Sequence, residues 1–251
     1  MELQTSIIIL AILFFFVAFT YSSVGLAGGS SYTALMTIFG LSPMTIPIVS
    51  LMLNVFVSSV GSYNFIRHDH ARFKIIAPFL VTSIPMAYVG GSLKISPDVF
   101  YWVLFLSLIL VAARIFLFST MTLHLELGAG QKIAVSLIAG MLLGLVAGIV
   151  GIGGGIYLVP LIIILGLGSE QEAAACGAVF IWLNSCTGLI SRLQNNAIDI
   201  TDYLPLIIAV VAGGALGSFL GASKFPARML QRILGGVILL AIMILGRRLL
   251  F

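Results

Sequence analysis

Two glycine clusters could supply backbone N–H groups to a bound anion. The first reads Gly28-Gly29-Ser30-Ser31, and the second is Gly153-Gly154-Gly155 within GIVGIGGGIYLVP at 148–160. Glycine lacks a Cβ, so its backbone can adopt a positive φ and a ligand can approach it closely. A helix that begins directly after such a cluster places unpaired N–H groups and the positive end of its dipole at the break. Two such helix ends predict an anion site that uses no formal positive charge.

Close helix packing is the alternative interpretation of these glycines. We assign packing to Gly144 and Gly148, whose spacing is typical of small residues between two membrane helices. Three consecutive glycines cost a helix about 1 kcal/mol each relative to alanine, and packing does not require a run of three. The clusters therefore favour a role in binding. The candidate substrate-binding residues are Gly28, Gly29, Ser30, Ser31, Gly153, Gly154, Gly155, Tyr157, Asn54 and Asn184.

Several polar side chains in apolar segments have two interpretations each. Asn54 and Asn184 fall in the middle of their segments, where an amide either joins two helices or contacts a substrate. Tyr32 and Tyr157 follow the two glycine clusters, and each either offers a hydroxyl group or packs as an aromatic ring. Arg192 lies at the end of its segment and is predicted to be an interfacial anchor.

All eight acidic residues lie near segment ends or in loops, so no carboxylate is placed to relay protons or sodium ions through the membrane. This pattern favours an anion substrate and leaves the coupling ion unidentified. His68-Asp69-His70 are adjacent and cannot close a tetrahedral metal site alone, so we interpret them as a charged turn. No metal or other cofactor is expected. The chain has no GxSxG or HExxH motif, and we expect no enzymatic activity.

The composition requires a lipid environment. Of the 251 residues, 61% are hydrophobic and 8% are charged, and the mean hydropathy is +1.22. A soluble domain has about 25% charged residues, so we expect an all-α polytopic membrane protein. A spanning helix needs about 20 apolar residues. Such segments occur near 5–24, 45–66, 74–93, 98–118, 132–150, 171–191, 203–222 and 228–249, and shorter runs at 31–41 and 156–168 each follow a glycine cluster.

The sequence indicates an internal repeat. The segment VGLAGGSSY at 24–32 aligns with VGIGGGIY at 150–157 at an offset of 126 residues, and Gly90 aligns with Gly217 at an offset of 127. Each half has the same order of long segment, glycine cluster, short segment and three long segments. The predicted units are a first membrane repeat, 1–122, and a second membrane repeat, 123–251.

The relative orientation of the repeats depends on the short segments. If each short segment re-enters or crosses the membrane, each repeat has an odd number of crossings and the two repeats are inverted. If it continues a broken span, the repeats are parallel. Under inversion, one side of the membrane collects eight basic residues, and the other collects Lys94, Arg192, Arg247 and Arg248. Because cytoplasmic loops are enriched in Lys and Arg, this distribution favours inverted repeats with both termini outside.

The arrangement resembles the TauE/SafE family, also called the toluene-sulfonate uptake permease (TSUP) family. The resemblance lies in GLVAGIVGIGGGIYLVP at 144–160, in VGLAGGSSYTALMTIFGLSP at 24–43 and in the repeated order of segments, and it covers nearly the whole chain. It implies a transporter that moves sulfite, sulfoacetate or other sulfonates across a bacterial inner membrane. The first cluster reads Ala27-Gly28-Gly29 where the second has three glycines, so the two half-sites need not contribute equally.

Two other functions are open at this level. A lipid-carrier flippase would share the short segments, but it needs a lateral opening with basic residues at depth. A permease for another organic anion is the second. The expected partners are a small organosulfur or sulfite anion and membrane lipid, and a homo-oligomer is left open. The basic residues are scattered through loops, so no nucleic-acid partner is expected.

Overall fold

The computed structural model describes residues 2–23, 26–67, 72–117, 127–195, 200–220 and 227–250. Every regular element in these ranges is helical. The helices before residue 118 are α1 (Glu2–Ser22), α2 (Gly29–Ile38), α3 (Thr45–Arg67), α4 (Phe73–Ser92) and α5 (Pro97–Phe116). The later ones are α6 (Ala129–Val150), α7 (Gly155–Ile164), α8 (Glu170–Asn195), the 3-10 turn η1 (Ile200–Tyr203), α9 (Leu204–Leu220) and α10 (Ala227–Leu250). The predicted boundary between residues 122 and 123 lies outside the described residues.

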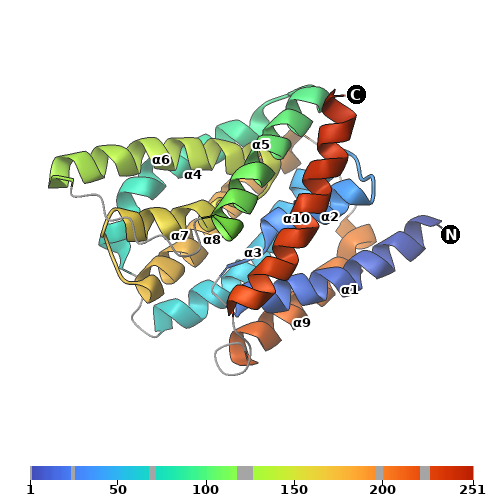
Figure 1. The fold of residues 1–251 in the computed structure, drawn as a ribbon, viewed down its shortest axis with the longest axis horizontal. Helices are drawn as coiled ribbons and strands as arrows, with labels where there is room; N and C mark the ends of the chain where they lie inside the picture. Colours follow the sequence, from blue (N-terminus) through green and yellow to red (C-terminus); the bar gives the residue numbers. More distant parts are fainter. Residues whose placement is uncertain are drawn as a thin grey trace.

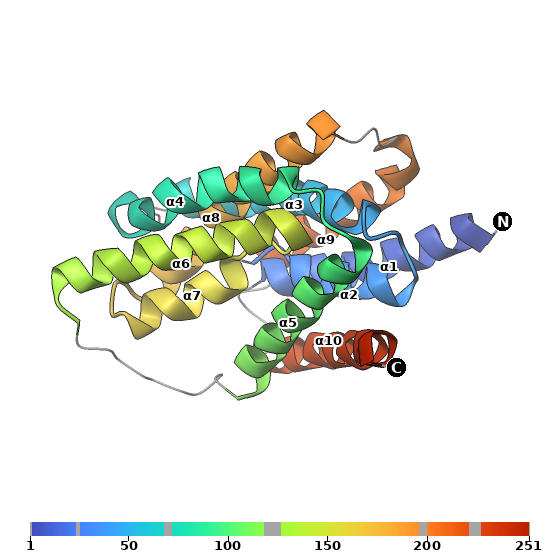
Figure 2. The same cartoon turned by 90° about the horizontal axis from the view of Figure 1, so that it is seen from above.

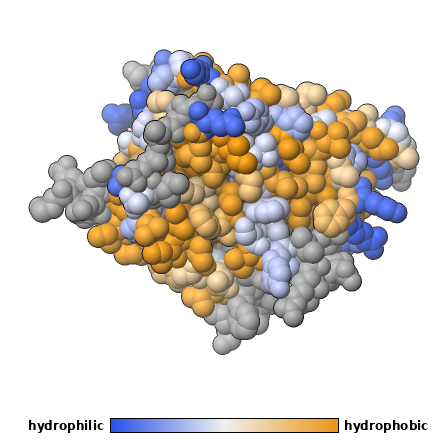
Figure 3. Space-filling model, turned by 180° about the vertical axis from the view of Figure 1, so that it is seen from behind, coloured by the Kyte–Doolittle hydropathy of each residue, from blue (hydrophilic) through white to orange (hydrophobic). Residues whose placement is uncertain are grey.

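Long apolar helices make up most of the molecule. Five of them are long and apolar enough to cross a membrane: Thr45–Tyr63, Phe73–Ser92, Pro97–Phe116, Ala129–Val150 and Glu170–Gln194. Their outer faces expose large apolar side chains such as Val81, Leu110 and Leu142, and Figure 3 shows apolar side chains over much of one face. Lipid solvates such a surface, whereas water does not. The expected all-helical fold is therefore confirmed for the described residues, and its helices are those of a multi-pass membrane protein.

The helices pair between the two halves of the chain. α1 packs along α9, α4 packs along α6, and α3 packs against α8 (Figures 1 and 2). α5 and α10 pack on each other at one side of the bundle. α1 begins at the end of the molecule where the N-terminus lies, whereas α6 begins at the opposite end, so the two helices run in opposite directions (Figure 2). The two halves are therefore interleaved and do not form separate lobes.

Glycines allow the closest of these helix contacts. On α6, Gly144 and Gly148 lie against the backbone carbonyl groups of Ser83 and Ala87 in α4, and a Cβ at either glycine would overlap the carbonyl oxygen. On α9, Gly217 lies in the same way against the Phe19 carbonyl of α1. Small residues permit this approach between membrane helices. The packing role predicted for the two glycines of α6 is confirmed.

Candidate functional site

The two short helices each lie between left-handed glycines. α2 follows Gly28, at φ +89°, and α7 follows Gly154, at φ +76°. After the two helices come Gly40 and Gly166, at φ +73° and +60°. Other L-residues adopt such φ values at a cost of about 1–2 kcal/mol, so glycine at these positions lets the chain turn sharply. Each helix has ten residues and is about 15 Å long, half of the roughly 30 Å hydrocarbon core.

The second glycine cluster reverses the chain between α6 and α7. α6 ends at Val150, and Gly151, Gly153 and Gly154 all have positive φ values. α7 then runs back toward the end of the molecule at which α6 begins (Figures 1 and 2). The segment 151–154 is buried, as backbone that leaves helical geometry at membrane depth has to be.

Two side chains of α3 hold the reversed segment. The Ser50 hydroxyl donates a hydrogen bond to the Gly151 carbonyl oxygen at 2.7 Å, and the Asn54 amide donates to the same oxygen at 3.1 Å. Both side chains are fully buried. The last carbonyl groups of a helix have no partner within it. The two side chains supply the hydrogen bonds that the Gly151 carbonyl would otherwise lack, and so they stabilise the end of α6. Asn54 therefore joins two helices, one of the two roles that the sequence left open.

Arg192 of α8 also donates hydrogen bonds to carbonyl groups at the end of α6. Its Nε donates a hydrogen bond to the Gly148 carbonyl at 3.0 Å, and its Nη2 donates to the Ile149 carbonyl at 2.6 Å. The residue is only 7% exposed. A cation at a helix C-terminus is favourable because that end of the dipole is negative. The structure thus corrects the interpretation of Arg192 as an interfacial anchor: its guanidinium is buried and bonded to another helix.

The two glycine clusters meet at Asn54. A Cβ on Gly29 would lie 2.6 Å from the Asn54 amide nitrogen and 2.5 Å from the Ile152 carbonyl oxygen. A Cβ on Gly153 would lie 3.1 Å from the same amide nitrogen. The Asn54 Oδ1 is buried and has no hydrogen-bond partner among the described residues. A side chain at Gly29 would overlap both the amide and the Ile152 carbonyl, and a side chain at Gly153 would crowd the amide.

The other predicted glycines face apolar or aromatic side chains. A Cβ on Gly28 would approach Tyr32 to 3.2 Å. A Cβ on Gly154 would lie 2.9 Å from the Phe180 ring. These two residues therefore shape the chain around the site, whereas Gly29 and Gly153 border its polar centre.

Tyr21 binds the two serines that follow the first cluster. Its hydroxyl oxygen lies 3.2 Å from both the Ser30 and the Ser31 hydroxyl oxygens, and all three side chains are buried. Tyr32 packs its ring on Phe14 at 4.8 Å between centroids, the aromatic role considered from the sequence. The sequence did not single out Tyr21, because nothing in its local pattern shows that α1 brings it to the start of α2.

Two predicted residues point to other partners. The Tyr157 hydroxyl donates a hydrogen bond to the Ser107 carbonyl of α5 at 2.7 Å. The Asn184 amide donates to the Phe180 carbonyl of its own helix at 2.8 Å. Ser185, next to Asn184, lies closer to the second cluster, since a Cβ on Gly153 would be 3.4 Å from its hydroxyl oxygen.

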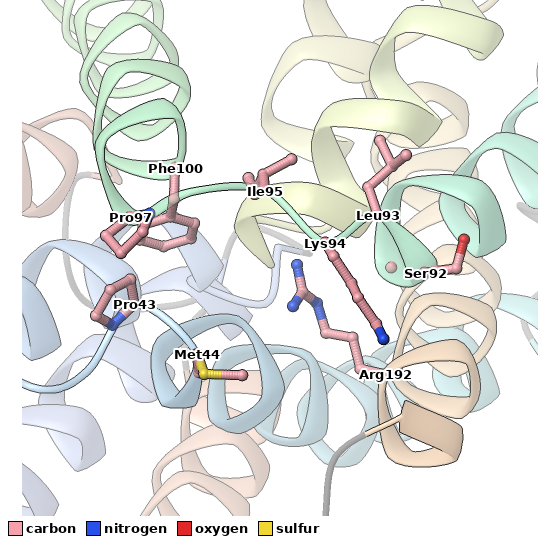
Figure 4. Close-up of a pocket in the computed structure, with 10 residues that line it drawn as sticks. Pro43, Met44, Ser92, Leu93, Lys94, Ile95, Pro97, Phe100 and Arg192 are labelled. Carbon is pink, nitrogen blue, oxygen red and sulfur yellow. The ribbon is translucent and has the colours of Figure 1, made fainter.

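A pocket of about 420 Å³ opens beside Arg192, between the α4–α5 connection and the start of α3 (Figure 4). Lys94 also lines it, and Figure 4 shows the Lys94 chain lying next to the Arg192 side chain. We refer to it as the Lys94–Arg192 pocket. Its lining residues are Pro43, Met44, Gly91, Ser92, Leu93, Lys94, Ile95, Pro97, Phe100 and Arg192.

No group of three or more His, Cys, Asp or Glu residues in the described ranges is arranged to hold a metal ion. His68-Asp69-His70 lie outside those ranges. The described polar centre consists of amide, hydroxyl and backbone groups.

The long apolar helices are those of a multi-pass membrane protein, and they enclose a buried polar centre at Asn54. The sequence profile of the family described as "Sulfite exporter TauE/SafE" matches residues 10–245. The chain belongs to this family.

Two relatives are membrane transporters by their names. The "Probable membrane transporter protein y4hK" of Sinorhizobium fredii is 34% identical over 244 residues, covering 95% of this chain and 98% of the relative. The "Probable membrane transporter protein YjnA" of Bacillus subtilis is 23% identical over 261 residues, with the same two coverages. No solved structure matches the chain significantly.

Proposed function

We propose that this protein transports small sulfur-containing oxyanions, such as sulfite, sulfoacetate and other sulfonates, across the bacterial inner membrane. Membership of a family described as sulfite exporters supports an anion of this size and charge. The helix ends at the two glycine clusters supply N–H groups for it, and the acidic residues stay out of the middle of the apolar segments.

We propose further that residues 1–122 and 123–251 are repeats of inverted topology. Gly90 lies against the Leu145 carbonyl, and Gly217 lies against the Phe19 carbonyl. The two glycines are 127 residues apart and the two carbonyl groups are 126 apart, so in the proposed alignment of the repeats Gly90 corresponds to Gly217 and Phe19 corresponds to Leu145. Each contact is therefore the counterpart of the other, with the two halves exchanged. A two-fold axis that relates the halves would produce such an exchange. The opposite directions of α1 and α6 support an axis in the membrane plane (Figure 2).

The distribution of basic residues supports one orientation. Arg72, Lys74, Arg114 and Lys132 belong to the larger basic set and would lie on the cytoplasmic side. Lys94 and Arg192 would then lie toward the outside. Both chain termini would be outside as well.

The proposed substrate site centres on Gly29, Asn54 and Gly153, with Ser30 and Ser31 beside the first of them. The meeting of both glycine clusters at Asn54 is the observation that carries this assignment, because inverted repeats with interrupted helices place their substrate where the interruptions meet. Asn54 has no exposed surface, so the anion reaches it only when the two halves move relative to each other. Alternating access of the halves supplies that motion.

Anion flux into liposomes that contain the purified protein tests the proposal. We expect saturable movement of sulfite or sulfoacetate in preference to chloride, measured with and without an imposed pH gradient. A flux that follows the gradient after correction for substrate ionisation would identify proton coupling. The absence of flux for every sulfur oxyanion, combined with movement of a fluorescent lipid between leaflets, would contradict the proposal in favour of a flippase.

A further inference from the structure

One face of α7 borders an apolar groove. The buried residues Leu158 and Ile162 pack α7 onto α8. The half-buried residues at helical spacing on the other side of α7 are Tyr157, Pro160, Leu161 and Ile164. Together with α6 they form a recess of about 320 Å³, to which α6 contributes Ala139, Leu142 and Leu143. The Tyr157 hydroxyl is bonded to α5, so the lining is apolar throughout. We refer to this recess as the α6–α7 groove.

The corresponding face of the other short helix is covered by the chain. In the proposed alignment of the repeats, α2 corresponds to α7 and α10 corresponds to α5. α10 packs along α2, and residues 29–37 are all buried. α5 makes only slight contact with α7, since its main partner is α10. Among the described residues, therefore, α7 lacks the cover that α2 receives, and its outer face is left to a molecule from outside the chain.

Lys132 lies at one end of the groove. It precedes Ala139 by seven residues, which places both on the same face of α6. A Cβ on Gly166, two residues after α7 ends, would lie 3.8 Å from the Lys132 Nζ. Within the described ranges this ammonium group is in no ion pair. It has three N–H donors, so a phosphate at the end of the groove can accept from it.

The groove has the depth of one lipid leaflet. From Lys132 to Leu143, α6 rises about 16 Å, roughly half of the 30 Å hydrocarbon core. The other end of α7 joins the buried reversed segment 151–154. The charge therefore lies toward one membrane surface and the apolar lining extends toward the midplane, an arrangement that complements a lipid with an anionic head group and an apolar chain.

We propose that the α6–α7 groove binds an anionic phospholipid, with the phosphate at Lys132 and one acyl chain between α6 and α7. The lipid takes the place on α7 that α10 takes on α2, and it supports the short helix that follows the second glycine cluster. The comparison with α2 rests on the proposed repeats. The proposed orientation assigns the lipid to the cytoplasmic leaflet, where basic recesses between membrane helices bind anionic head groups.

Native mass spectrometry of the full-length protein in detergent tests the head group. The probes are phosphatidylglycerol and phosphatidylcholine with the same acyl chains. We expect phosphatidylglycerol to bind about fivefold more tightly, the effect of one basic residue near an anionic lipid, and Lys132→Gln to remove this preference. Lys74→Gln is the matched control, because Lys74 is an exposed lysine outside the groove and belongs to the same basic set.

Ala139→Phe tests the acyl chain. Its ring would occupy the groove, so we expect the Kd for phosphatidylglycerol to rise at least about tenfold through the loss of buried apolar area. Ala134→Phe is the control, since Ala134 is exposed on the same helix and lies outside the lining. A melting curve in detergent shows whether each variant is folded, and Lys132→Gln tests the site without a change in the groove.

Equal Kd values for the two lipids in the wild type would overturn the proposal, as would equal Kd values for phosphatidylglycerol in Lys132→Gln and Lys74→Gln. A lipid-free dimer that Ala139→Phe dissociates would also overturn it and assign the groove to a second copy of the chain. Failure of the proposed transport function is separate, because it would appear as wild-type protein that moves no sulfur oxyanion, and the lipid measurements contain none.

Discussion

Asn54 of α3 donates a hydrogen bond to the carbonyl oxygen of Gly151, a residue 97 positions further along the chain. The same amide lies against Gly29. In the proposed alignment of the two repeats Ile181 corresponds to Asn54, and a Cβ on Gly155 would lie 2.5 Å from the Ile181 side chain. The polar contact is therefore made from one half only, and one amide serves both glycine clusters.

Asn54→Leu should separate stability from transport. Leucine has a similar size, and the Gly151 carbonyl keeps its hydrogen bond from Ser50. The substitution also removes a buried amide oxygen without a partner among the described residues, so we expect the free energy of unfolding to change by less than about 1 kcal/mol. Sulfite flux should fall at least about tenfold, the effect of about 1.4 kcal/mol in the transition state. Thermal unfolding in detergent and liposome flux measure the two quantities.

Asn184→Leu is the control for this substitution. Asn184 is equally buried, but its amide bonds to its own helix. We expect flux close to that of the wild type. Loss of flux in this variant and retention of flux in Asn54→Leu would move the substrate site to α8.

The helices could be predicted from the sequence because the signals are local. Each long apolar segment became a helix of similar bounds, and the short run at 31–41 became α2, which ends at Ile38 before the left-handed Gly40. The spacing of Ser50, Asn54 and Ser58 at every fourth residue also carried a usable signal, because it places three polar groups on one face of α3. Only Asn54 of these was a candidate from the sequence.

The partners of the site residues could not be predicted, because they depend on which helix ends lie together. Arg192 follows an apolar segment, and such a position is typical of an anchor in the membrane interface. The end of α6 lies beside it only because α6 packs with α4 and α8. In the same way the Tyr157 hydroxyl finds the Ser107 carbonyl on α5, 50 positions away.

Arg192→Gln should destabilise the protein. The variant loses charged hydrogen bonds to the Gly148 and Ile149 carbonyls. Hydrogen bonds from a charged group contribute about 1.5–3 kcal/mol each, so we expect the loss of two of them to cost at least about 3 kcal/mol of stability. Arg192→Lys should recover part of it, because an ammonium group can reach one carbonyl. Unfolding by SDS in mixed micelles measures the stability of the wild type, Arg192→Lys and Arg192→Gln, which we expect to decrease in that order. Equal stability of the wild type and Arg192→Gln would contradict the prediction.

Gly148→Ala should weaken the contact between α4 and α6. The new methyl group would overlap the Ala87 carbonyl, and overpacking of this kind costs about 1–3 kcal/mol. Gly130→Ala is the matched control on the same helix, because a Cβ there meets nothing within 4 Å. It should be neutral or stabilising by about 0.4–1 kcal/mol. Equal melting temperatures for the two variants would show that the stability of the protein does not depend on the close contact between Gly148 and the Ala87 carbonyl.

Gly40→Ala and Gly154→Ala should separate backbone strain from contact. Both positions have a positive φ, so each alanine costs about 1–2 kcal/mol. A Cβ on Gly40 meets nothing within 4 Å, whereas one on Gly154 lies 2.9 Å from the Phe180 ring. We therefore expect Gly154→Ala to lower the melting temperature further and to reduce flux, and Gly40→Ala to keep its flux. Equal loss of flux in both variants would mean that strain alone, and not the shape of the chain at the second cluster, limits transport.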